Sequence, residues 1–224
     1  MRKVVLLSGG MDSLVCLAEA HAAGGEIYAL HLDYGQKTSV RETAAFGAIC
    51  DHYGLDAGHR KIVSMAFLRQ IGGSSLTDDA MAVNQAGLKP GIPSSYVPFR
   101  NSIILSLAVS WAETLDAKEV YVGANFEDSP GYPDCRPEYY EAMNRVVALG
   151  TRDGDIRLLT PVLRLHKKDV VARGRALGVP FEKSWSCYVA NDRACGKCDS
   201  CLLRLKGFQE NGEVDPLPQH DQGV

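Results

Sequence analysis

Short apolar segments alternate along the chain with longer segments that have helical spacing. A short apolar run bounded by turn residues is typical of a strand in a parallel sheet. Five segments of this kind occur at residues 4–7, 26–32, 61–63, 119–123 and 156–161. Helical segments lie at residues 14–20, 39–53, 102–115, 137–149 and 167–177. The alternation predicts an α/β fold with a doubly wound parallel sheet and helices on both faces.

Two long polar segments interrupt this pattern. Residues 72–98 are rich in Gly, Pro and Ser. A segment of this length in a compact domain is either functional, such as a lid over a site, or a disordered insertion. Residues 124–136 follow a predicted strand and contain two prolines, a glycine, three acids and an arginine. Loops in this place often carry binding groups, although a stiff surface loop has the same composition.

The turn between the first strand and the first helix has the sequence Ser8-Gly9-Gly10-Met11-Asp12-Ser13. Free backbone N–H groups and the positive end of the helix dipole make such a turn an anion site. The segment is neither a Walker A loop nor a dinucleotide fingerprint, because the Gly-Lys-Ser/Thr and the third glycine are missing. Asp12 would repel a phosphate, unless it caps the helix or holds a metal ion that also binds the phosphate.

Composition and charge narrow the class of protein. The 224 residues suffice for one domain with an appendage. The net charge of −3 gives no indication of a large nucleic-acid surface. We expect no membrane span, because no apolar stretch approaches about 20 residues, and no signal peptide. Seven cysteines, four of them crowded together, argue against a secreted disulfide framework and favour the cytoplasm.

Four of the cysteines have the spacing of a metal site. Cys187, Cys195, Cys198 and Cys201 follow the pattern Cys-x7-Cys-x2-Cys-x2-Cys. Four thiolates bind Zn²⁺ tetrahedrally and leave no open position, which predicts a structural zinc site. An iron–sulfur cluster or a redox Cys-x-x-Cys pair are the alternatives. The apolar contexts of Cys16 and Cys50 predict core positions, whereas the context of Cys135 leaves its role open.

Read together, the motifs resemble the 7-cyano-7-deazaguanine synthases, a family of ATP pyrophosphatases in queuosine biosynthesis. The resemblance extends from residue 4 to about residue 205 and rests on residues 8–13, 33–36, 97–101, 129–136, 160–161, 167 and 187–204. Residues 131–136 and the cysteine spacing are its most specific parts. Two positions depart from the family pattern: Phe99 stands where the family has Gly, and Pro130 precedes Gly131. These departures bear on substrate choice more than on ATP chemistry.

The resemblance implies a cytoplasmic, homodimeric ligase. Its substrates would be 7-carboxy-7-deazaguanine, ammonia and ATP, and its products 7-cyano-7-deazaguanine, AMP and pyrophosphate. The carboxylate would be adenylated and converted to an amide, and the amide would be activated in the same site, so we expect two ATP per turnover. The expected cofactors are structural Zn²⁺ and Mg²⁺ bound with ATP, and no nucleic-acid partner is expected.

The resemblance also implies roles for individual residues. ATP would be bound by Ser8, Gly9, Gly10, Met11, Asp12 and Ser13. The expected catalytic residues are Asp12, which would act through Mg²⁺, and Arg100 and Lys167, which would stabilise charge on the α-phosphate or the substrate carboxylate. The substrate would be bound by Arg100, Asn101, Tyr132, Asp134 and Arg136. We expect an ATP pyrophosphatase domain over 1–180, a zinc-binding segment over 181–210 and a tail over 211–224.

Three other functions remain open from the sequence. The chain would fit a tRNA-thiolating ATP pyrophosphatase, or a relative that stops at the amide of a 7-deazapurine. A zinc-stabilised nucleic-acid-binding module would need basic residues around the metal site. Arg193, Lys197, Arg204 and Lys206 lie there, but they are offset by Asp192 and Asp199, so the signal for this module is weak.

Overall fold

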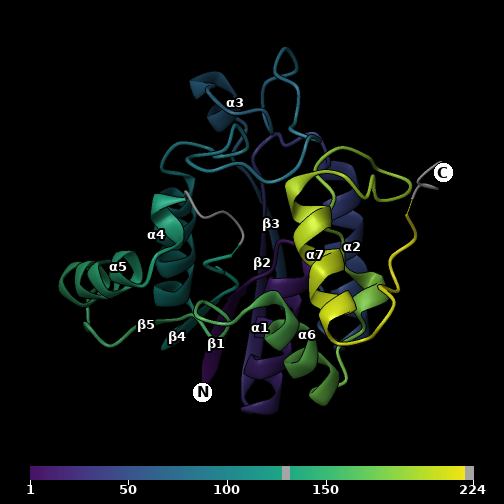
Figure 1. Ribbon diagram of the computed structural model, residues 1–224. Helices are drawn as coiled ribbons and strands as arrows, with labels where there is room; N and C mark the ends of the chain where they lie inside the picture. The colour runs from purple at the N-terminus through teal and green to yellow at the C-terminus, as the bar shows by residue number, and fades with distance from the viewer. Residues whose placement is uncertain (128–131, 220–224) are drawn as a thin grey trace.

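A five-stranded parallel sheet forms the centre of the molecule (Figure 1). The computed structural model describes residues 1–127 and 132–219. Ser129, Pro130 and Gly131, three positions of the predicted substrate motif, lie outside the described residues, as does the end of the predicted tail. The strands are β1 (Arg2–Leu6), β2 (Glu26–Asp33), β3 (Arg60–Ser64), β4 (Glu119–Val122) and β5 (Arg157–Leu159). Their order is β3-β2-β1-β4-β5, and each neighbouring pair is parallel.

Helices cover both faces of this sheet, which confirms the predicted fold class. They are α1 (Met11–Ala22), α2 (Ser39–His52), α3 (Phe67–Ile71), α4 (Arg100–Thr114), α5 (Pro137–Gly150), α6 (Lys167–Ala176) and α7 (Asp199–Glu210), with two 3-10 turns, η1 (Pro133–Cys135) and η2 (Phe181–Lys183). Most ends of the predicted helices agree with the structure within one or two residues. Two helices, α3 and α7, were not predicted. Residues 72–98 form no helix or strand, in agreement with the prediction of a long loop.

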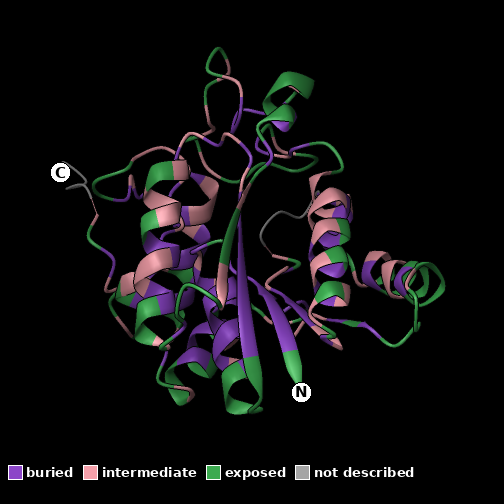
Figure 2. Cartoon of the chain, turned by 180° about the vertical axis from the view of Figure 1, so that it is seen from behind, coloured by how far each residue is buried: buried purple, intermediate pink, exposed green. Residues whose placement is uncertain are grey.

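The central strand β1 divides the core in two, because successive side chains of a strand point to opposite faces. Val4 packs with the side chains of α4 and α5. Val5 packs on the other face with those of α1, α2, α6 and α7. Figure 2 shows the central strands buried over most of their length. The edge strand β3 is partly exposed, with Ile62 about half-exposed.

The C-terminal segment packs on the sheet domain and shares its core. Phe181 of η2 and Phe208 of α7 are almost fully buried among side chains of α1 and α6. Arg204 of α7 forms a buried ion pair with Asp215, with the two bonds 2.7 and 2.9 Å long. This pair fixes the chain beyond residue 211 against α7. Among the described residues, no helix is both long and apolar enough to cross a membrane.

Candidate active site at the switch point of the sheet

The strand order reverses between β1 and β4, and a cavity of about 220 Å³ opens at the carboxyl ends of these strands. Open α/β sheets bind ligands at this point, because the connections after the two strands diverge and leave a crevice. The cavity is lined by the turn after β1, by Gly123 after β4, by the start of α4, and by Trp185 and Tyr188 of the C-terminal segment. Predicted site residues from distant parts of the chain therefore meet here.

The turn after β1 is preformed by local hydrogen bonds. Gly9 has φ +91°, a left-handed conformation that favours glycine, and a Cβ there would lie 2.9 Å from the Glu42 carbonyl oxygen. The N–H of Gly10 donates to the Ser8 hydroxyl at 3.2 Å, and the Ser13 hydroxyl donates to the Gly10 carbonyl at 2.9 Å. The two serine hydroxyls lie 3.1 Å apart. The start of α1 thus presents its backbone donors to the cavity.

Gly123 fixes the distance between β4 and α1. A Cβ on Gly123 would lie 2.6 Å from both the N and the Cα of Ser13, so the backbone of the anion loop would have to move. We expect Gly123→Ala to destabilise the fold by about 1–3 kcal/mol through overpacking and to weaken ATP binding. Denaturant unfolding and ATP titration measure the two effects. Gly150→Ala, where a Cβ has open space, is the matched control, and equal behaviour of the two variants would contradict the prediction.

Asp12 is not the helix cap, so the capping alternative is wrong. Gly10 occupies the N-cap position of α1, and Asp12 lies in the first turn. Its Oδ1 accepts a 2.8 Å bond from Nζ of Lys167, which is itself almost fully buried. The ion pair holds the cation beside the anion loop, where it can stabilise negative charge that develops on a bound phosphate.

Glu127 positions Lys167 at the start of α6. One carboxylate oxygen accepts the Lys167 backbone N–H at 2.7 Å, and the other lies 2.7 Å from Nδ1 of His166. Burial by itself would raise the pKa of Glu127, but these two bonds outweigh it and the pKa is lowered. The charged carboxylate therefore caps the helix that carries Lys167.

Polar atoms without partners gather around the cavity. Within the described part of the chain, Nε of Arg100, Oδ1 of Asp134 and the hydroxyl of Tyr140 are buried and have no hydrogen-bond partner. Arg100 and Tyr140 line the cavity. Burial raises the pKa of Asp134, although the Arg100 charge opposes the shift. Because buried polar groups in native proteins are normally paired, these three atoms indicate a site that is completed by a polar ligand.

Tyr34 holds the guanidinium of Arg100 in place. Nη1 of Arg100 donates to the Tyr34 hydroxyl at 2.8 Å, and the guanidinium carbon lies 5.0 Å from the centre of the Tyr34 ring. Burial raises the pKa of Tyr34 to about 12, so the hydroxyl stays protonated. Stacking and the hydrogen bond together orient the guanidinium for a bidentate contact.

Only some of the other predicted substrate-binding residues line the cavity. Asn101 and Tyr132 line the cavity, and Asn101 also contacts Asp134, with its N–H 3.4 Å from Oδ2 and its Nδ2 3.3 Å from the carbonyl oxygen. Arg136 is exposed, donates to the Pro133 carbonyl and does not line the cavity. Its role in substrate binding stays a prediction. In the ATP loop, Met11 is buried in the core and does not line the cavity.

Phe99 occupies a backbone position that suits glycine. Its φ of 55° lies in the left-handed region, and its side chain is 65% exposed. A bulky residue there is strained, whereas glycine is not. The side chain does not line the cavity, so the substitution of Gly by Phe99 leaves the described wall of the pocket unchanged.

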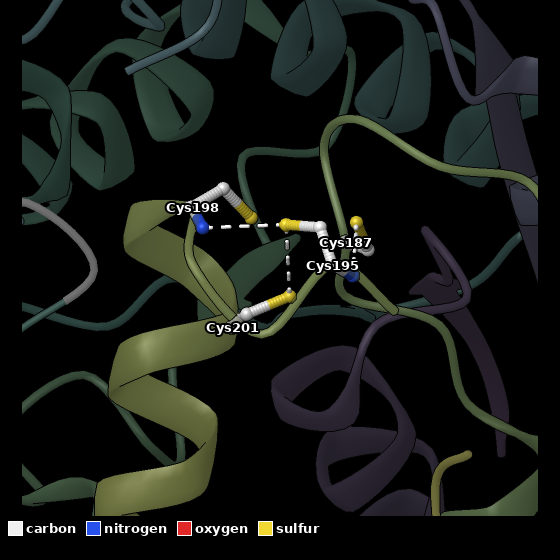
Figure 3. A group of neighbouring side chains, drawn as sticks. All are labelled: Cys187, Cys195, Cys198 and Cys201. Atoms are coloured by element: carbon white, nitrogen blue, oxygen red, sulfur yellow. Dashed lines mark hydrogen bonds between the residues drawn. The ribbon is translucent and has the colours of Figure 1, made fainter. Parts of the chain in front are cut away.

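The four predicted cysteines converge on one point (Figure 3). Their sulfur atoms all lie within 4.8 Å of one another, a separation that allows them to hold a metal ion. Sγ of Cys187 accepts backbone N–H groups from Val189, Ala190 and Cys195 at 3.3–3.4 Å. Hydrogen bonds from the Cys198 and Cys201 thiols lower the pKa of Cys187 furthest, and the N–H groups of Ala190 and Cys195 add to the shift. The predicted four-cysteine metal-binding group is confirmed.

The remaining thiols have different surroundings. Cys16 and Cys50 are fully buried in the core, as predicted, and burial raises the pKa of Cys50 to about 12. Cys135 is also buried, but it lines the cavity. The metal-binding segment contacts the anion loop directly, because the N–H of Trp185 donates to the Gly9 carbonyl at 2.8 Å.

A family profile described as "Queuosine biosynthesis protein QueC" matches residues 2–212. The chain belongs to the QueC family. It is 51% identical over 219 residues to a protein of Chlorobium phaeobacteroides and 52% identical over 221 residues to one of Koribacter versatilis, both named 7-cyano-7-deazaguanine synthase. Each alignment covers 97% of this chain and 96% or 92% of the relative. The predicted family is therefore confirmed.

Solved structures with the same fold are much more distant in sequence. A predicted subunit of tRNA methyltransferase from Methanocaldococcus jannaschii has a TM-score of 0.51 and 14% identity, with 99% of this chain and 94% of that chain covered. NMN synthetase from Francisella tularensis has a TM-score of 0.50 and 17% identity, with 95% and 77% covered. At these identities the likeness supports the fold alone.

Several residues of the cavity in this QueC-family chain were not predicted from the sequence. Glu42 of α2, Tyr140 of α5 and Trp185 line it. Glu42 and Tyr140 lie in predicted helices, and Trp185 lies in the predicted zinc-binding segment. An ordinary helical glutamate or a buried aromatic residue has the same pattern. Only Glu42 could have been suspected from its place in the sequence. It lies in the first turn of the helix that follows the predicted strand end at Asp33, where ligands often bind.

Proposed function

We propose that this protein converts 7-carboxy-7-deazaguanine, ammonia and ATP into 7-cyano-7-deazaguanine, AMP and pyrophosphate. Membership of the QueC family supports the proposal, and one observation of the site carries it. A single cavity joins a preformed anion loop to unpaired buried polar atoms of Arg100 and Tyr140, and the unpaired Oδ1 of Asp134 lies behind Asn101 in its wall. Such a cavity suits a nucleotide whose phosphates face a second, polar and planar ligand.

The anion loop is the proposed site of the β- and γ-phosphates. Ser8, Gly10 and Ser13 line the cavity at this loop, and the α1 dipole favours negative charge there. Asp12 is the carboxylate that would hold Mg²⁺, and the ion would supply positive charge to the bound phosphates. Lys167 stands beside it and neutralises charge at the α-phosphate as pyrophosphate leaves.

The start of α4 and η1 form the proposed substrate side of the cavity. Arg100 is the proposed partner of the substrate carboxylate, because its Nε is free and its plane is fixed by Tyr34. Asp134 can accept hydrogen bonds from the N–H edge of a guanine-like base. Its position is set by Asn101, and Tyr132 adds an aromatic wall.

The chemistry explains why ATP is required. A carboxylate oxygen is a poor leaving group, and its transfer to AMP allows it to leave as part of a phosphate ester. Ammonia then forms the amide. Conversion of the amide to a nitrile removes the remaining oxygen of the original carboxylate. This amide oxygen must therefore be adenylated in turn, in the same site. Each turnover therefore consumes two ATP.

Zinc is the proposed metal of the four-cysteine group, and its role is structural. Four sulfur ligands with no open position are typical of a structural Zn²⁺ site. The chain would act as a homodimer in the cytoplasm without a nucleic-acid partner, as the resemblance implies. Elemental analysis of the purified protein distinguishes zinc from iron.

Mass spectrometry of a reaction with ATP, Mg²⁺, ammonium and 7-carboxy-7-deazaguanine tests the proposal. We expect the nitrile, with two AMP formed per nitrile. Omission of ammonium is the control and should stop product formation. An amide as the final product would contradict the nitrile assignment and favour a relative that stops at this stage. AMP formation without either product would contradict the proposed substrate.

A further inference from the structure

Glu42 lies in the wall of the cavity, next to the anion loop. It belongs to the first turn of α2, and its carbonyl oxygen packs against Gly9. Arg100, Tyr34 and Ser8 line the same cavity. Glu42 therefore lines the cavity that contains the proposed phosphate and carboxylate positions.

The Glu42 carboxylate is held by neutral donors. Nε2 of Gln36 donates to Oε2 at 2.8 Å, and the Thr38 hydroxyl donates to Oε1 at 2.6 Å. Gln36 is buried, and its side-chain amide is oriented because its own Oε1 atom accepts the backbone N–H of Tyr34 at 2.9 Å. Each carboxylate oxygen retains further acceptor capacity, so this network fixes the side chain without using up its lone pairs.

The negative charge of Glu42 is not cancelled by a cation. In residues 1–127 and 132–219, Lys167 pairs with Asp12, and no Lys or Arg forms an ion pair with Glu42. The neighbouring Arg41 turns toward the Trp185 ring instead, with its guanidinium carbon 4.6 Å from the ring centre. Glu42 is thus a carboxylate of the cavity that is free to attract a small cation.

Several titratable and charged groups lie around Glu42. The Glu42 charge acts on His31 of β2 and on Tyr34 after β2, and Asp33 at the end of β2 acts on the same two side chains. Arg41 precedes Glu42 on its own helix. Asp12 of α1, Arg100 of α4 and Tyr188 of the C-terminal segment line the same cavity. Burial lowers the pKa of His31, so its ring is neutral. Arg100 is held by Tyr34.

The amidation step needs a cation site and a base. At neutral pH ammonia is present mainly as ammonium, which has no lone pair and cannot attack a carbonyl carbon. A carboxylate beside the acyl group attracts ammonium, and it can accept the proton that must leave before the attack. Nothing else in the described wall of the cavity combines a negative charge with the absence of a cationic partner.

We propose that Glu42 binds the ammonium ion of the amidation step and accepts its first proton. This inference rests on the proposed function. The ammonium gives one proton to the Glu42 carboxylate, and the lone pair of the resulting ammonia forms the C–N bond. The C–O bond to the phosphate breaks, and its electron pair leaves with AMP. The amide nitrogen loses its second proton to water.

The Glu42→Gln variant tests this proposal, since it keeps the shape of the side chain and removes its charge. We expect kcat/KM for ammonium to fall about 10²-fold near neutral pH. The loss should shrink as the pH rises, because free ammonia replaces ammonium. Hydroxylamine, which is largely neutral near pH 7, should restore acyl transfer as the hydroxamate. Pyrophosphate exchange that depends on 7-carboxy-7-deazaguanine should stay unchanged.

The exchange assay separates this inference from the proposed function and also shows that the variant is folded. Absence of exchange in the unmodified protein would contradict the proposed function itself. Normal exchange with unchanged ammonium kinetics in Glu42→Gln would overturn the role of Glu42. Loss of exchange, or a raised Mg²⁺ requirement for it, would show that Glu42 acts on ATP or its metal and would overturn the role as well. Asp51→Asn, at the exposed end of the same helix, is the control and should behave like the unmodified protein.

Discussion

Lys167→Met should lower kcat by about 10³-fold, because it removes a fixed cation from the place where phosphate charge develops. The side chain is almost fully buried and lies 2.8 Å from Asp12, so water cannot replace its charge. Stability should also fall, by about 3–5 kcal/mol, because a carboxylate is left without its buried partner. Steady-state kinetics and denaturant unfolding measure the two losses.

Two further variants separate catalysis from stability. Lys168→Met removes the same charge from an exposed neighbouring position. It should leave kcat and the free energy of unfolding nearly unchanged. The double variant Asp12→Asn, Lys167→Met removes both charges and should regain most of the lost stability, but not the activity. Recovery of activity in the double variant would show that Lys167 serves only to neutralise Asp12.

The second large effect is expected from the four-cysteine group. Cys198→Ser, or removal of the metal by a chelator, should lower Tm by about 10 °C or more, since 1 kcal/mol corresponds to about 2–4 °C for a domain of this size. Metal binding contributes directly to the free energy of folding at such sites. Activity should fall too, because the N–H of Trp185 in this segment donates to the Gly9 carbonyl of the anion loop.

Calorimetry and elemental analysis check this expectation together. Cys50→Ala, which changes a buried thiol outside the group, should keep the full metal content and serves as the control. A Cys198→Ser protein with unchanged metal content would contradict the four-sulfur site. A metal-free protein with unchanged Tm would contradict its structural role.

The chain alone determined the architecture and the chemical class of the site. Apolar runs separated by helical segments are sufficient to predict a parallel sheet, because both faces of each strand must be covered. The anion loop was also predictable, since residues 8–13 are contiguous and its donors are backbone groups. The cysteine group was predictable for the same reason: short spacings allow the sulfurs to reach one ion.

Tertiary structure decided which distant residues meet in the site. Lys167 reaches Asp12 across 155 positions of sequence, and only the packing of α6 beside α1 brings them together. Glu42 and Tyr140 join the cavity from α2 and α5, which pack beside β2 and β5, whereas Arg136 turns outward from its motif. Local patterns fix secondary structure, but the partner of a side chain depends on contacts between elements that are far apart in the chain. The sheet order β3-β2-β1-β4-β5 sets those contacts and so builds the site.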